Sequence, residues 1–169
     1  LNSKTVPKTT NNRTYITNNN CGNITNNITI NVNPLGRENW NYLNDDVVLE
    51  IMKGVNSCIP EMVKTIHFNK EHPENQNIRI TNKKLPEIKT FNGESWDTKN
   101  KKDTIESIIT NLVDRLESEY GEDFKSKSTK FIQELWEQKI SPIIDKQKIA
   151  TKLRKQVEYS ILDGQFELK

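Results

Sequence analysis

Both histidines of the chain lie in one polar stretch, which runs from His67 to Asn77. Their H-x₄-H spacing falls within the second half of Cys₂His₂ zinc sites, where imidazole nitrogens and thiolates hold the metal. Cys21 and Cys58 would complete the count of ligands, but they lie far apart in the sequence instead of forming a tight knuckle. We therefore expect no metal site here, and no cofactor.

The same stretch raises the question of an HNH-type nuclease, in which paired histidines and an asparagine build a metal-bound general base. The candidates are His67, His72, Asn75 and Asn77. Their spacing does not match cleanly, and the pattern predicts a helix before the stretch and a strand after it, not the usual ββα unit. The alternative is structural: His67 ends a helix, where its charge would favour the helix dipole, and the asparagines bond the backbone of a turn. We assign the stretch as a loop motif of unknown role.

Other catalytic patterns are missing from the sequence. It contains no P-loop, G-x-G-x-x-G, G-x-S-x-G or H-E-x-x-H, and no serine, cysteine or lysine has a convincing activating partner nearby. The formal net charge of +2 produces no global field that would imply a nucleic-acid partner. No apolar run approaches the roughly 18 residues of a membrane span. We expect a protein that is not an enzyme and not in a membrane.

The first third of the chain holds a tail and a strand-like segment. Residues 1–12 have no period and are expected to be loose. Within residues 13–33, apolar and polar residues alternate toward the end, as in an amphipathic strand. Such a strand must cover its apolar face and pair its edges, which copies of the same segment from other subunits would do. The expected oligomer interface consists of Ile24, Ile28, Ile30 and Val32.

A bland explanation of this segment stays open. The chain holds 22 Asn and a single Ala, which is typical of an AT-rich genome. Codon bias alone would then produce a low-complexity, Asn-rich linker at residues 13–33. The strict alternation over residues 28–32 favours the strand.

The middle of the chain predicts two short helices followed by a small antiparallel sheet. Asn44 begins a helix that stops near Gly54, and Ser57 caps a second one. Strands are expected at residues 78–81, 87–91 and 94–98. The Asn-Gly pair at 92–93 marks a hairpin turn between the last two.

The remainder predicts helices. Apolar residues at 3–4 spacing indicate a helix over residues 104–120, capped by Asp103 and ended by Gly121. A last helical region covers residues 127–162, is kinked or split by Pro142, and is closed by Asp163-Gly164.

Basic residues concentrate in this last region. Such a cluster is typical of phosphate contact, although an acidic helix at residues 106–123 suggests complementary packing instead. The candidate nucleic-acid-binding residues are Lys146, Lys148, Lys152, Arg154 and Lys155.

Three stretches carry a resemblance: residues 30–39 (INVNPLGREN), residues 66–69 followed by 72–78 (IHFN and HPENQNI), and residues 91–96 (FNGESW). Together they resemble a C-terminal domain of mimivirus-like giant DNA virus proteins, which often follows a C2H2 zinc finger or another DNA-binding module and a coiled coil. The resemblance covers roughly residues 24–120. It implies a viral protein of the host-cell virus factory or the virion, whose upstream part binds nucleic acid. It implies no enzymatic activity.

These observations predict an α+β chain with an N-terminal strand-forming oligomerisation segment, two short helices, a small antiparallel sheet and C-terminal helices. We expect the 1–12 tail and the 13–33 assembly segment to precede an α+β domain at 34–120 and a helical extension at 121–169. The leading hypothesis is a non-enzymatic domain for homo-oligomerisation and interaction. The first alternative is nucleic-acid binding by the basic helix, and the second is an HNH-like nuclease.

Overall fold

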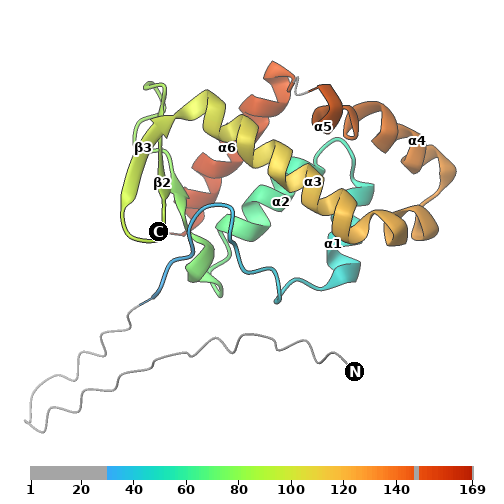
Figure 1. The fold of residues 1–169 in the computed structure, drawn as a ribbon, viewed down its shortest axis with the longest axis horizontal. Helices are drawn as coiled ribbons and strands as arrows, with labels where there is room; N and C mark the ends of the chain where they lie inside the picture. The colour runs from blue at the N-terminus through green and yellow to red at the C-terminus, as the bar shows by residue number, and fades with distance from the viewer. Residues whose placement is uncertain (1–29, 147–148, 169) are drawn as a thin grey trace, which may run out of the picture.

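The structure, a computed structural model, describes residues 30–146 and 149–168. It combines helices with a three-stranded antiparallel sheet, which confirms the predicted α+β class. In Figure 1 the sheet stands at one end of the fold, the long helix α3 (Lys101–Lys127) crosses the front, and α2 (Cys58–His67) lies behind it. The segment that precedes α1 (Asp45–Lys53) runs from the sheet side towards that helix.

The two short helices form at the predicted positions. Asn44 caps α1, because its side chain accepts a hydrogen bond from the N–H of Asp46 at 2.8 Å. Ser57 stands at the start of α2 but makes no side-chain cap bond. The apolar stripe of α2 is buried along its length and includes Ile59, Met62, Val63 and Ile66.

A single 3₁₀ turn, η1 (Pro73–Asn75), precedes the sheet. Its strands are β1 (Ile78–Arg79), β2 (Glu87–Phe91) and β3 (Trp96–Asn100), in the order β1-β2-β3. The Asn-Gly turn is confirmed, and Gly93 adopts a φ of +108° there.

The third strand begins two residues later than predicted. Oδ1 of Asn92 accepts hydrogen bonds from the N–H groups of Glu94 and Ser95, at 2.8 Å each. These two residues are therefore part of the turn and not of the strand. As a result β3 reaches Asn100, and its last residue becomes the cap of α3.

Both predicted ends of the long helix are wrong. Asn100, and not Asp103, caps α3: its side chain accepts from the N–H of Asp103 at 3.1 Å. The helix also continues through Gly121 to Lys127. Gly in a helix costs about 1 kcal/mol relative to Ala, but the next turn buries Phe124 against Trp136, with ring centroids 4.9 Å apart. This burial offsets the cost of the glycine.

The last helical region is split, as predicted from Pro142. It consists of α4 (Lys130–Lys139), α5 (Pro142–Lys146), which begins at the proline, and α6 (Thr151–Glu167). The predicted stop at Asp163-Gly164 is wrong, since α6 continues past this pair. Gly164 is buried against Phe68, and the ring leaves no room for a side chain there. The glycine therefore serves close packing and does not end the helix.

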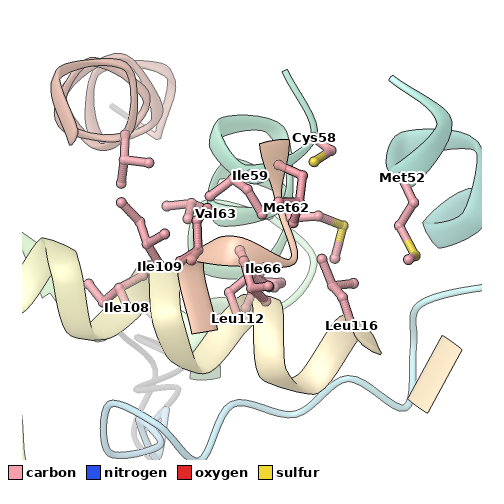
Figure 2. Close-up of a cluster of buried hydrophobic side chains, with 14 of the residues drawn as sticks. Met52, Cys58, Ile59, Met62, Val63, Ile66, Ile108, Ile109, Leu112 and Leu116 are labelled. Atoms are coloured by element: carbon pink, nitrogen blue, oxygen red, sulfur yellow. The ribbon is translucent and has the colours of Figure 1, made fainter. Parts of the chain in front are cut away.

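The core lies between α2 and α3, with α1 at one side (Figure 2). The side chains of α2 point towards a matching stripe on α3, formed by Ile108, Ile109, Leu112 and Leu116. Helix α6 packs against α2 as well, and buries Val157 and Ile161 completely. This packing fixes the C-terminal end of α2, where His67 lies.

Candidate functional site

His67 is the last residue of α2 and is 4% exposed. Its Nδ1 lies 2.9 Å from Oδ1 of Asn77, whose Nδ2 donates to Oε1 of Glu38 at 2.8 Å. Because the amide nitrogen of Asn77 donates to the carboxylate, its oxygen is the acceptor, and Nδ1 of His67 carries the hydrogen. One amide therefore connects α2 to the segment before α1.

The imidazole of His67 is neutral near pH 7. Complete burial lowers its pKa below the usual 6.5, although the charge of Glu38 and hydrogen bonds to Asn77 and Asn75 act in the opposite direction. The expected role of His67 as a charged partner of the helix dipole is therefore wrong. The ring instead serves as a hydrogen-bonding group inside the fold.

Asn75 is fully buried and holds the segment before α1 by three hydrogen bonds. Its Oδ1 accepts from Nδ2 of Asn33 at 3.1 Å and from the N–H of Asn39 at 2.8 Å. Its Nδ2 donates to the carbonyl of Asn39 at 2.7 Å. A side-chain amide thus pairs with both backbone groups of Asn39, as a neighbouring strand would.

His72 belongs to the same network but has different partners from His67. Its ring stacks on Tyr42 at a centroid distance of 3.5 Å, and its Nδ1 lies 3.1 Å from Oε1 of Glu74. Partial burial acts to raise the pKa of Glu74, but hydrogen bonds from its own backbone, His72 and Asn39 outweigh this and lower it.

We call this network the polar clamp, because it fastens the segment 33–42 to α2, η1 and β2. Two backbone bonds support it: the N–H of Asn33 donates to the carbonyl of Glu74 at 2.7 Å, and that of Leu35 to Phe91 at 2.9 Å. The three stretches quoted for the resemblance meet here. The side chains of the polar clamp are those of Asn33, Glu38, Asn39, His67, His72, Glu74, Asn75 and Asn77.

Beside the polar clamp lies an open cavity of about 300 Å³ between residues 35–40, α2 and α3. Its wall combines apolar side chains with Glu38, His67, Asn111 and Arg115. The Arg115 guanidinium lies 3.9 Å from the ring centre of Trp40, a cation–π contact that closes one side. The cavity exists because the clamped segment forms one of its walls.

The histidine stretch does not gather metal ligands. Across residues 30–146 and 149–168, no group of three His, Cys, Asp or Glu side chains is arranged to hold a metal ion. Cys58 is buried in the core at the start of α2, and burial raises the pKa of its thiol to about 12. Cys21 lies outside the described residues. His67 and His72 are each engaged in separate contacts within the polar clamp.

Ion pairs join the last helix to α3, and one of them involves a candidate basic residue. Arg154 contacts Glu106 of α3, and Nζ of Lys101 lies 2.6 Å from Glu158 of α6. The Arg154–Glu106 pair agrees with complementary packing between the acidic and basic helices, whereas the Lys101–Glu158 pair has its base on α3 and its acid on α6. Lys152 and Lys155 are exposed; Lys148 lies outside the described residues, and the side chain of Lys146 is not described.

The predicted oligomer interface falls mostly outside the described part. Ile24 and Ile28 precede it. Ile30 is 47% exposed, Val32 is half-buried, and residues 30–33 do not belong to the sheet. Ile30 is therefore an apolar side chain left open to solvent immediately before the polar clamp.

The histidine stretch predicts only half of the polar clamp. It includes His67, His72, Asn75 and Asn77 but not their partners Asn33, Glu38 and Asn39. Their signal was present in the resemblance stretch at 30–39, but the pairing joins positions up to 42 residues apart. No local pattern encodes such a contact.

Comparison with protein-family models, curated proteins and solved structures gives no match. Among the described residues, no helix is long and apolar enough to cross a membrane. What the chain does must therefore be argued from its own geometry.

Proposed function

We propose that this chain is a non-enzymatic oligomerisation and interaction domain. The observation that carries the proposal is the polar clamp, which fastens residues 33–42 to the folded body by hydrogen bonds. Whatever precedes residue 33 is thereby presented at one defined place. A polar network that attaches a chain segment to the folded body supports a role in positioning that segment.

The segment that the polar clamp presents is the one with alternating apolar residues. Ile30 is exposed just before the polar clamp, and Ile24 and Ile28 share its parity in the sequence. Full cover by another subunit would stabilise the assembly by roughly 1.5–3 kcal/mol for each such side chain. Homo-oligomerisation through this segment would remove these apolar side chains from water.

The biological setting is part of the proposal and is supported by the sequence resemblance alone. It places the chain in a modular giant-virus protein, in the virus factory of the host cytoplasm or in the virion, with an upstream nucleic-acid-binding part. In such a protein, this domain would bring several copies of the upstream module together and so raise their avidity for nucleic acid.

Sedimentation equilibrium tests the proposal. The full chain is expected to show a multiple of its 19.7 kDa mass, and a chain of residues 34–169 the monomer mass. Because the shorter chain also lacks Asn33, circular dichroism must first show that it remains folded. An equal oligomeric state in both chains would refute the assignment of the segment.

A further inference from the structure

The two edges of the sheet differ in whether their backbone groups are used. At the β1 edge, the N–H of Ile80 donates to Oε1 of Gln165 at 2.6 Å, and Nε2 of Gln165 donates back to the carbonyl of Ile80 at 3.1 Å. The side-chain amide of α6 thus imitates one residue of a neighbouring strand. Helix α6 packs along β1 and so covers this edge.

The β3 edge is open, and its register shows which groups face outward. Hydrogen-bonded pairs alternate with non-bonded pairs along an antiparallel ladder. The N–H of Asn92 donates to Ser95 at 3.0 Å and that of Lys101 to Pro86 at 2.8 Å, which fixes the alternation at both ends of the hairpin. Trp96 and Thr98 then direct their backbone N–H and C=O away from β2. Within the described residues these groups have no hydrogen-bond partner.

The side chains along this edge alternate in character. Trp96 pairs across the hairpin with Phe91 and lies under the guanidinium of Arg79, 4.1 Å from its ring centre. Asp97 and Lys99 point to the opposite face of the sheet, because successive residues of a strand alternate. A strand added here would lie beside Trp96 and Thr98 on the outer face. On the other face, which buries Ile88 and Thr90, it would lie beside Asp97 and Lys99.

The segment 24–32 has this alternation, except at Asn26. Its apolar residues Ile24, Ile28, Ile30 and Val32 occupy even positions, and every odd position from 25 to 31 is Thr or Asn. Paired with β3, its isoleucines would lie beside Trp96 and its Thr and Asn side chains beside Asp97 and Lys99. Cross-strand pairs of aromatic and β-branched residues each contribute about 0.2–1 kcal/mol relative to Ala–Ala pairs.

The segment cannot place its last residues on the β3 edge of its own chain. The N–H of Leu35 is bonded to Phe91, whose N–H is bonded to Asn77, so the clamped segment lies on the β1 side of β2. An added strand beyond β3 would lie about three strand spacings away, roughly 14 Å. Ile30 is three residues before the fastened Asn33 and reaches only about 11 Å from it. When residues 30–32 pair at this edge, they must therefore come from a second copy.

We propose that the outer edge of β3, at Trp96 and Thr98, accepts the segment 24–32 of a second copy of this chain as an additional strand. This inference rests on the proposed oligomerisation and names the surface that receives the segment. Each copy then donates one segment and offers one edge, as in reciprocal exchange of a strand between subunits.

A Thr98→Pro variant of the full chain tests the inference. The N–H of Thr98 points away from β2, so proline removes the outward donor and leaves the hairpin ladder intact. The matched control is Thr98→Ala, which also loses the hydroxyl that accepts from Lys89 but keeps the N–H. Circular dichroism checks that both variants are folded.

In sedimentation equilibrium we expect Thr98→Ala to keep the mass of the unchanged chain and Thr98→Pro to fall to the monomer mass. If both variants remain oligomers while a chain of residues 34–169 is a monomer, the segments pair elsewhere: this inference fails and the proposed function stands. Loss of the oligomer in both variants also overturns the inference, because the backbone edge is then not the determinant. A monomeric unchanged chain overturns both proposals.

Discussion

Gly164 of α6 lies directly against the ring of Phe68, so that a Cβ on this glycine would come within 2.4 Å of Cγ of Phe68. This contact joins the last helix to the residue that follows α2. Gly121 of α3 is its counterpart, because it is also a helical glycine but has no atom of another residue near its missing Cβ.

We predict opposite effects of alanine at these two glycines. Gly164→Ala should lower the free energy of unfolding by about 1–3 kcal/mol, because the ring of Phe68 must move out of a packed core. Gly121→Ala should raise it by roughly 0.5–1 kcal/mol, since it improves helix propensity without a clash. Urea denaturation measures both. A stabilised Gly164→Ala variant would show that the helices are not packed this closely.

These two glycines also show what could be predicted from the sequence and what could not. Strong periodicity located the helices, and Asn92-Gly93 located the hairpin, because both are local signals. Each glycine was predicted to end a helix, and neither does: at Gly121, burial of Phe124 in the next turn carries the helix on. At Gly164, the partner lies 96 residues away in the chain (164 − 68). The amphipathic pattern cannot report on such distant contacts.

Contacts between residues far apart in the sequence also explain why only half of the polar clamp could be predicted. The stretch from His67 to Asn77 was notable for its residue types, but Asn75 acts on Asn33 and Asn39, whose positions no period marks. The interface residues Ile24 and Ile28 lie outside the described part, so their assignment stays a prediction.

Loss of the Asn75 amide should release the clamped segment. Asn75→Ala removes three hydrogen bonds and leaves the backbone groups of Asn39 unpaired, at about 1–3 kcal/mol for each unsatisfied group. We expect faster tryptic cleavage after the exposed Arg37, measured on the folded protein by mass spectrometry.

Asn82→Ala is the control for this cleavage experiment. Asn82 is exposed, and its side chain accepts only a local bond from the N–H of Lys84 at 3.0 Å. Its variant should be cleaved after Arg37 at the rate of the unchanged chain. Equal rates in Asn75→Ala and Asn82→Ala would mean that Asn75 does not hold the segment.

The neutral state of His67 predicts that stability decreases in mild acid. Burial holds the pKa of His67 below the 6.5 of the unfolded chain, so the unfolded state binds more protons as the pH falls below about 6.5. The free energy of unfolding should therefore decline from about pH 7 to pH 5, before most carboxylates titrate. His67→Gln, which cannot titrate, should show a flatter decline. Urea denaturation at several pH values measures this decline. An equal decline of the free energy of unfolding in the two proteins would contradict the prediction.

Cys58 should resist thiol reagents in the folded protein. It is fully buried, and burial raises the pKa of its thiol to about 12, so very little thiolate exists at pH 8. In a Cys21→Ser variant, which removes the other cysteine, a disulfide reagent should label Cys58 only after urea is added. Rapid labelling without urea would show that the start of α2 is open.

The central claim is that the alternating isoleucines before the polar clamp hold copies of the chain together. The most direct measurement compares the sedimentation-equilibrium mass of the full chain with that of a variant in which Ile24, Ile28 and Ile30 are Thr. Threonine keeps the β-branched shape that suits a strand but removes the apolar surface. We expect a multiple of 19.7 kDa for the unchanged chain and the monomer mass for the variant. The same mass for both proteins, whether monomer or oligomer, would contradict it.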